Sequence, residues 1–158
     1  MIGAVVFDIG NVLIRWHPER VYDALIGKDR RRRMFAEVDL HAMNDRIDRG
    51  ANWQMVVQET ARAFPEYQTE IQLWYDRWLE MATPEISESW ELLEALKGNN
   101  VPVFALSNFG IETFDLARKH YPKLERFDRA YISGHLGVTK PAPRIYEIVE
   151  ETCGIPPE

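Results

Sequence analysis

The chain has 158 residues, of which 46% are hydrophobic, and its formal net charge is −6. A chain of this length can bury a core and suits one domain, or a small domain with an insertion. The negative charge argues against nucleic acid or an anionic membrane as the main partner, because both would repel it. A small soluble substrate is the simpler expectation.

The N-terminal apolar run is interrupted by Asp8 and has no basic segment before it. It therefore has the features of neither a signal peptide nor a membrane-spanning helix. The single cysteine, Cys153, allows no internal disulfide, and nothing in the composition indicates an oxidising compartment. We expect a cytoplasmic protein.

The first predicted element is a buried strand over residues 2–9, whose apolar run reaches the carboxylate of Asp8. Gly10 and Asn11 follow at once. Open α/β sheets place their chemistry at the carboxyl ends of their strands. Asp8 is therefore the first candidate catalytic residue.

Residues 18–82 are rich in charged and aromatic side chains and show helical spacing. Trp74 and Trp78 are four positions apart, with Ile71 and Met81 three positions to either side. This spacing predicts one apolar helix face, and it favours the core of a small helical bundle over a stacking surface for sugars. Trp16 and His17, at the entry to this segment, are the better candidates for a pocket.

The rest of the chain alternates between predicted helices and strands. The pattern predicts a helix over 87–97, a strand over 101–106, a helix over 113–120, a strand over 129–133, a turn leading to Lys140, and a helix that begins at Pro141 or Ala142 and ends near Gly154. Strands that alternate with helices form parallel sheets. Asp8, Ser107 and the loop before Lys140 can therefore meet at one edge of an α/β sheet.

Three fragments in this order resemble motifs one, two and three of the haloacid-dehalogenase-like hydrolase superfamily: residues 4–13, 101–108 and 137–141. The resemblance implies a Rossmann-like parallel-sheet core, residues 1–16 and 84–158. A small helical cap, residues 17–83, would be inserted after the first strand. The family's fourth motif, an acidic pair after a later strand, is not found before Glu158, so the last strands of the core are expected to be missing.

The resemblance implies a magnesium-dependent phosphatase in which Asp8 attacks phosphorus and forms an aspartyl-phosphate. A carboxylate can do this when its target is neutralised and held in line. Ser107 and Asn108 would hold the phosphoryl oxygens, through hydroxyl and backbone N–H groups. Lys140 would stabilise the charge that builds up during transfer.

The resemblance also implies that Mg²⁺ binds to the Asp8 carboxylate and the Gly10 backbone carbonyl. These are the oxygen ligands that magnesium prefers. The remaining protein ligand in the family comes from the fourth motif, so the predicted metal site is incomplete. Gly10, Asn11 and Trp16 are the further candidates for contact with the substrate.

Gly10 departs from the pattern of many family phosphatases, which carry a second aspartate at this position as general acid and base. The loss matters less when the leaving oxygen is already a good leaving group, as in a sugar 1-phosphate. The sequence over residues 8–13 most resembles a bacterial subgroup related to α-D-glucose-1-phosphate phosphatase. A small phosphorylated metabolite, with a sugar phosphate as the first guess, is the expected substrate.

Two other interpretations remain open. The glycine two residues after Asp8 also resembles the 2-haloacid dehalogenases, which need no metal. The absence of the acidic motif would fit the N-terminal piece of a longer enzyme, which the retained Asp8, Ser107 and Lys140 favour. It would also fit a naturally shortened, catalytically impaired relative that acts as a binding or regulatory protein. In that case the first strand would have an unpaired edge, and a homodimer could form through this edge.

Overall fold

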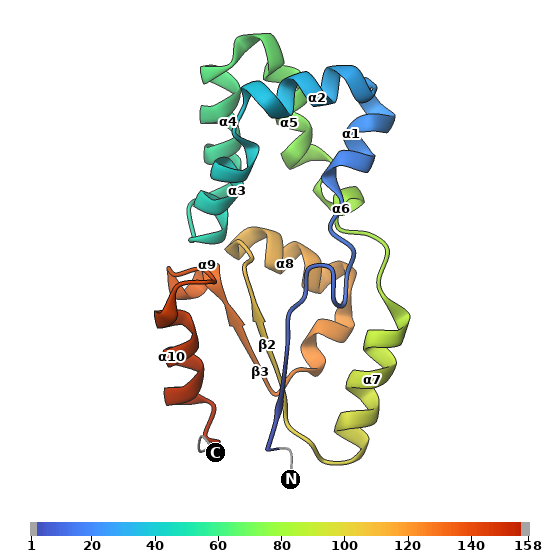
Figure 1. The fold of residues 1–158 in the computed structure, drawn as a ribbon, viewed down its shortest axis with the longest axis vertical. Helices are drawn as coiled ribbons and strands as arrows, with labels where there is room; N and C mark the ends of the chain where they lie inside the picture. Colours follow the sequence, from blue (N-terminus) through green and yellow to red (C-terminus); the bar gives the residue numbers. More distant parts are fainter. Residues whose placement is uncertain (1–2, 156–158) are drawn as a thin grey trace.

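The structure is a computed structural model that describes residues 3–155 (Figure 1). A β-sheet with its helices occupies one end of the elongated molecule, and a separate group of helices occupies the other. The prediction of an α/β fold is confirmed. No helix in the described part of the chain is both long enough and apolar enough to cross a membrane.

The described residues form a three-stranded parallel sheet in the order β1-β2-β3, with β1 at Val5–Phe7, β2 at Val103–Ser107 and β3 at Arg129–Ile132. These strands are shorter than predicted or shifted by one or two residues. Asp8 directly follows β1 and Ser107 ends β2, so both lie at the carboxyl edge of the sheet. Val6 on β1 is 48% exposed, and among the described residues β1 pairs with β2 alone.

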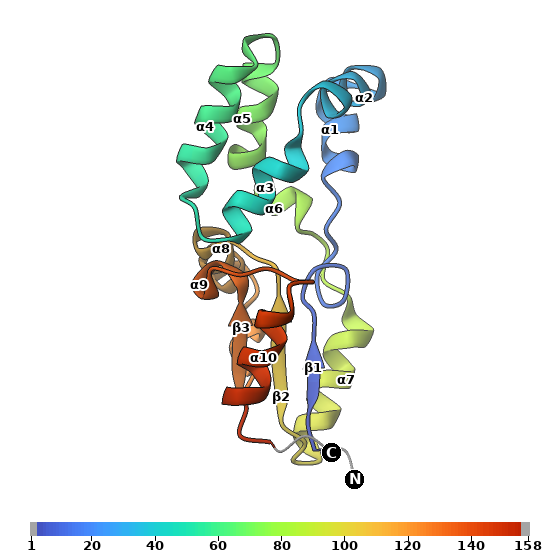
Figure 2. The ribbon, with the colours of Figure 1, turned by 60° about the vertical axis from the view of Figure 1, so that its left-hand side comes forward.

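Helices cover both faces of the sheet. Alternate residues of β2 point to opposite faces: Val103 and Ala105 join the core formed with α7 (Ser87–Gly98) and α8 (Ile111–His120). Phe104 and Leu106 pack instead with Ile145 of α10 (Pro143–Thr152). Figure 2 shows α10 in front of the strands. A short 3-10 helix, Pro122–Arg126, and the helix α9 (Ser133–Leu136) complete this end of the molecule.

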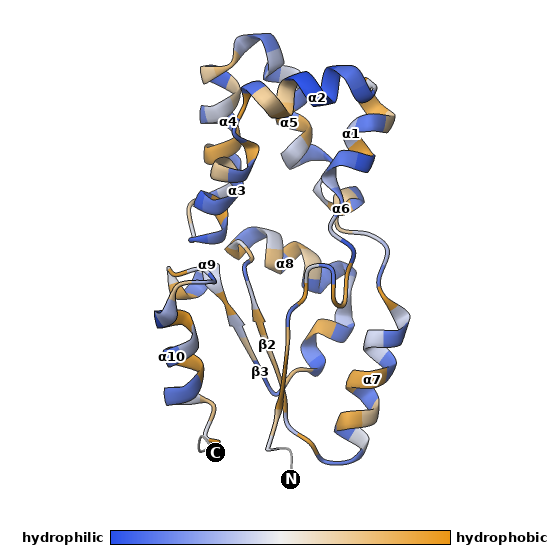
Figure 3. Ribbon diagram, viewed as in Figure 1, coloured by the Kyte–Doolittle hydropathy of each residue, from blue (hydrophilic) through white to orange (hydrophobic). Residues whose placement is uncertain are grey.

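Between β1 and α7, residues 18–81 form helices joined by short loops, as their spacing predicts. The elements of this helical segment are α1 (Pro18–Ile26), α2 (Lys28–Glu37), α3 (Leu40–Asp48), α4 (Trp53–Ala63), a 3-10 helix at Pro65–Tyr67, α5 (Gln68–Asp76) and α6 (Trp78–Met81). These helices lie beyond the carboxyl edge of the sheet (Figures 1 and 2). Figure 3 shows that α2 is mostly hydrophilic, and Met34 is its one buried residue.

The single helix predicted across Ile71, Trp74, Trp78 and Met81 is wrong in one respect. The helix is broken at Arg77, which caps the end of α5 and precedes α6. All four apolar side chains are nevertheless buried in one core. The break allows the face to turn, so that Trp78 reaches Phe109 near the sheet, with ring centroids 5.6 Å apart.

Two boundaries near the C-terminal end also differ from the prediction. The last helix begins at Pro143 rather than at Pro141 or Ala142, with proline in the first turn, where its missing N–H is no loss. The turn before Lys140 contains the short helix α9, which ends at Gly137 in the left-handed conformation, with φ of 70°. Both changes leave Lys140 in a loop at the edge that carries Asp8.

Candidate active site

Asp8 is the centre of a cluster of polar side chains from three separate parts of the chain. The Ser107 hydroxyl donates a hydrogen bond of 2.7 Å to Asp8 Oδ1, and the Lys140 ammonium lies 2.6 Å from Asp8 Oδ2. The backbone N–H of Ile9 also donates to Oδ1, at 2.8 Å. The structure therefore fixes the orientation of this carboxylate through both of its oxygens.

Asn108 holds the loop that carries Lys140. Its Oδ1 accepts a hydrogen bond of 2.7 Å from the Lys140 backbone N–H, and its Nδ2 donates one of 3.0 Å to the Lys140 carbonyl. The Asn108 amide thus makes two hydrogen bonds to the backbone of a single residue, Lys140. In the structure, the Asn108 side chain positions the backbone of the candidate lysine.

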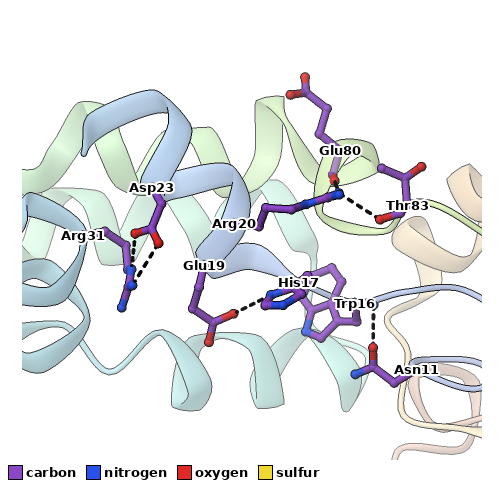
Figure 4. Close-up of polar contacts among 9 residues, drawn as sticks. All are labelled: Asn11, Trp16, His17, Glu19, Arg20, Asp23, Arg31, Glu80 and Thr83. Atoms are coloured by element: carbon purple, nitrogen blue, oxygen red, sulfur yellow. Dashed lines mark hydrogen bonds and ion pairs between the residues drawn. The ribbon is translucent and has the colours of Figure 1, made fainter. Parts of the chain in front are cut away.

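A tight loop after Asp8 presents Gly10 and Asn11. The Ile9 carbonyl accepts hydrogen bonds from the N–H groups of residues 12, 13 and 14, so the chain turns back on itself. Asn11 has φ of 57°, a left-handed conformation that asparagine tolerates better than most residues. Its Oδ1 accepts a 2.9 Å hydrogen bond from the Trp16 backbone N–H (Figure 4). The loop therefore links the site directly to the start of the helical segment.

A cavity of about 260 Å³ lies between the sheet edge and the helical segment. All the residues predicted from the sequence to act in catalysis, substrate contact or metal binding line it: Asp8, Gly10, Asn11, Trp16, Ser107, Asn108 and Lys140. His17 is not among its lining residues. It lies instead beside Glu19, with Nδ1 and Oε2 3.5 Å apart.

The helical segment contributes further side chains to this cavity, none of which the sequence predicts as a site residue. Asn44 and Asp48 of α3 line it, together with Trp78 and with Arg15 of the connecting loop. Asn44 and Asp48 are four positions apart and so share one face of α3. This spacing is too common on helices to have singled them out.

The Asp48 carboxyl is the strongly perturbed acid of this cavity. Burial, together with the nearby negative charge of Asp45, raises its pKa to about 7. Hydrogen bonds from the Asn44 side chain and the Gly110 backbone act in the opposite direction but do not cancel this effect. Asp48 therefore exchanges a proton near neutral pH.

The two chain segments that join the helices to the sheet are hydrogen-bonded to each other. The Arg15 N–H donates to the Pro84 carbonyl at 2.9 Å, and the His17 N–H donates to the Met81 carbonyl at 2.8 Å. The Arg20 guanidinium reaches the carbonyls of Glu80 and Thr83, at 3.3 and 2.9 Å (Figure 4). These contacts join the start of the helical segment to its end, next to the cavity that contains Asp8.

The residues around Asp8 fit a magnesium ion as a minimal set of ligands. Among the described residues the structure records no hydrogen bond to the Gly10 carbonyl oxygen, and Gly10 lines the same cavity as Asp8. Mg²⁺ commonly takes one or two carboxylates, with water and substrate phosphate as its other ligands. Residues 3–155 contain no cluster of three or more histidine, cysteine or acidic side chains that could hold a metal.

The chain belongs to the haloacid dehalogenase-like hydrolase family, whose sequence profile matches residues 2–158. A comparison with curated proteins finds no match. The family assignment therefore supports an enzyme of the hydrolase class, and it agrees with the resemblance drawn from the three sequence motifs.

Solved structures share the fold. A HAD family enzyme from Bacteroides thetaiotaomicron is 21% identical, with a TM-score of 0.74 over 99% of this chain and 80% of that one. A mutant of that enzyme in complex with magnesium and inorganic phosphate is 21% identical, with a TM-score of 0.73 over 98% and 80%. The L-2-haloacid dehalogenase of Xanthobacter autotrophicus is 20% identical, with a TM-score of 0.65 over 100% and 67%.

Proposed function

We propose that this hydrolase is a magnesium-dependent phosphatase for a small phosphorylated metabolite, with a sugar phosphate as the leading candidate. The observation that carries the proposal is the contact of Asp8 with both Ser107 and Lys140 at the floor of one cavity. A carboxylate held by a hydroxyl and an ammonium can receive a phosphoryl group, because the same two donors can hold the phosphoryl oxygens.

The proposed reaction has two steps. Asp8 attacks phosphorus and the bond to the leaving oxygen breaks, which gives an aspartyl-phosphate. Water then attacks this intermediate, so that phosphate leaves and the carboxylate is restored. Ser107 and Lys140 bind the phosphoryl oxygens, while Asn108 positions Lys140. Magnesium, held by Asp8 and the Gly10 carbonyl, would neutralise charge on the phosphoryl group.

The complexes of the Bacteroides enzyme with magnesium and phosphate support this assignment by analogy of fold. The likeness to the subgroup of α-D-glucose-1-phosphate phosphatase rests on the sequence over residues 8–13 alone. A cytoplasmic location and a homodimer through the β1 edge remain predictions.

A 2-haloacid dehalogenase is the second candidate function. Gly10 carries no side chain that could protonate an alkoxide, and a halide leaving group needs no proton. The fold is also shared with the Xanthobacter dehalogenase, whose structure has been solved with chloropropionic acid covalently bound. A binding or regulatory protein without turnover is the third candidate, and it is favoured by the small number of acidic ligands around Asp8.

The test is phosphate release from p-nitrophenyl phosphate and from sugar phosphates, with magnesium and with EDTA. We expect release that EDTA suppresses and that Asp8→Asn abolishes without loss of fold. Asp29→Asn is the matched control, because Asp29 is exposed at the start of α2. Retained hydrolysis by Asp8→Asn, in protein free of contaminating phosphatase, would contradict the mechanism. Release of chloride from 2-chloropropionate in EDTA would support the dehalogenase instead, and no turnover of either kind would support the binding protein.

A further inference from the structure

Asp48 brings a second carboxyl group to the cavity that holds Asp8. It is the last residue of α3 and lines the wall formed by the helical segment, whereas Asp8 lines the side formed by the sheet. Asp8 and Asp48 are the acidic residues among the described residues that line this cavity. The proposed reaction assigns a role to Asp8 and leaves Asp48 without one.

A short chain of hydrogen bonds fixes the Asp48 side chain. The Asn44 side chain donates to Asp48 Oδ2 at 2.9 Å, and Asn44 Oδ1 in turn accepts a 3.2 Å bond from the buried indole of Trp74. The indole thereby determines which end of the Asn44 amide faces Asp48. A carboxyl group offers about four positions for hydrogen bonds, so Asp48 keeps capacity for a bound molecule.

The backbone around Asp48 is packed tightly against the sheet end of the molecule. The Ser133 hydroxyl donates to the Asp48 carbonyl at 2.5 Å. A Cβ atom at Gly50 would lie 2.5 Å from the Gly134 carbonyl oxygen, and one at Gly110 would lie 2.6 Å from Ile47 Cγ2. Only glycine permits this close approach, which holds the end of α3 at the rim of the cavity.

Gly10 stands at the position that supplies the acid in many related phosphatases, and it has no side chain. A Cβ atom built on Gly10 meets no heavy atom within 4 Å, so nothing fills this position, and glycine itself supplies no proton donor. An alkoxide leaving group needs a proton as the bond to phosphorus breaks. A donor on the opposite wall of the cavity can meet that need.

We infer that Asp48 is the general acid and base of this enzyme, acting from the helical wall on the leaving group of a substrate held at Asp8. The inference rests on the proposed phosphatase function. As Asp8 bonds to phosphorus and the bond to the leaving oxygen breaks, the proton of the Asp48 carboxyl passes to that oxygen. In the second step the Asp48 carboxylate takes a proton from the attacking water, which restores the acid.

The charges around Asp48 are compatible with this cycle. The raised pKa, about 7, makes the acid form available near neutral pH. A protonated Asp48 also avoids repulsion with an anionic substrate. Charged or titratable groups on the neighbouring elements include Asp45 on α3, Glu112 on α8 and His135 on α9, and Asp8, Arg15 and Lys140 line the cavity.

The test compares leaving groups in wild type and in Asp48→Asn. The substrates are p-nitrophenyl phosphate, whose leaving group needs little protonation, and phenyl and alkyl phosphates, whose leaving groups need it strongly. We expect Asp48→Asn to lose roughly 100-fold or more in kcat/KM with alkyl phosphates, as is typical of lost general acid catalysis, because kcat/KM reports the steps up to departure of the leaving group. The loss of kcat/KM with p-nitrophenyl phosphate is expected to be less than about 5-fold, which also shows that the variant folds.

Asp76→Asn is the matched control, because Asp76 is likewise the last residue of its helix, α5, accepts a 3.2 Å hydrogen bond from the amide of Gln72 four positions earlier, and is not a lining residue of the cavity. It is expected to keep the wild-type dependence on the leaving group. A second measurement needs no variant: wild-type kcat/KM should fall above pH 7 with alkyl phosphates but not with p-nitrophenyl phosphate.

Equal losses across all leaving groups, with wild-type pH profiles that do not depend on the leaving group, would overturn the inference and leave the phosphatase intact. A wild-type protein that releases no phosphate from any of these esters would overturn both. A purely structural role for Asp48 would change the thermal stability but not the dependence on the leaving group.

Discussion

The Lys140 ammonium lies 2.6 Å from Asp8 Oδ2, although 132 positions separate the two residues. Neither side chain is deeply buried, since Lys140 is 21% exposed and Asp8 is 39% exposed. A pair this open to solvent contributes little to folding. Its geometry is therefore better explained by a role at the cavity than by a role in stability.

Replacing Lys140 by methionine tests this interpretation. The change keeps much of the side-chain volume but removes the charge that would stabilise the transferring group, so kcat is expected to fall by roughly 100- to 1,000-fold. Steady-state kinetics with p-nitrophenyl phosphate is the measurement. Lys97→Met is a close control, because the Lys97 side chain is also 21% exposed and pairs with a carboxylate, Asp128, at 2.8 Å. Equal activity of the two variants would exclude Lys140 from catalysis.

Asn108 is expected to act through Lys140. Asn108→Ala removes both hydrogen bonds to the Lys140 backbone, and each is worth about 0.5–1.5 kcal/mol. The freed loop should misplace the ammonium and lower kcat by about 10-fold or more. Asn99→Ala is the control, because Asn99 also donates from Nδ2 to a backbone carbonyl, that of Ala95, at 2.8 Å. A lower melting temperature with unchanged kcat would reduce Asn108 to a structural role.

The parts of the fold that could be predicted from the sequence depend on local patterns. Apolar runs that end on Asp8 and Ser107, and helical spacing between them, predict both the parallel strands and the inserted helices. The break at Arg77 could not be predicted, because the apolar spacing on either side of it is continuous and the turn is favoured by packing of Trp78 against rings from distant parts of the chain, such as Phe109. Local patterns thus predict elements better than they predict how those elements bend.

The candidate site likewise has one side that could be predicted from the sequence and one that could not. Its sheet side was predicted because Asp8, Ser107 and Lys140 stand at strand ends or in a loop of recognisable sequence. The helical side, with Asn44 and Asp48, depends on how α3 is docked against the sheet, which no short motif encodes. Close contacts at glycines, as between Gly50 and the Gly134 carbonyl, set this docking, and they become visible only in three dimensions.

Gly134→Ala tests the close packing of α9, whose Gly134 carbonyl Gly50 approaches from the helical end, against the loop between β2 and α8. The new Cβ would lie 2.8 Å from both the Ile111 nitrogen and the Phe109 carbonyl oxygen, and backbone atoms cannot move aside cheaply. Overpacking of this kind costs about 1–3 kcal/mol, so the urea midpoint should fall. Gly98→Ala is the control, because its Cβ would meet nothing within 4 Å and alanine favours helix by about 1 kcal/mol. Similar midpoints for the two variants would show that the contact is looser than the structure indicates.

The raised pKa of Asp48 also predicts how stability varies with pH. Between the ordinary aspartate pKa of 3.8 and about 7, the folded protein binds more protons at this site than the unfolded chain does. Its contribution to the free energy of unfolding therefore decreases as pH rises through this window and is constant above it. Asparagine does not titrate, so the stability of wild type relative to Asp48→Asn should fall from pH 4 to pH 7. Urea unfolding of both proteins at several pH values measures the difference, and a difference that does not vary with pH would show that Asp48 titrates normally in the folded protein.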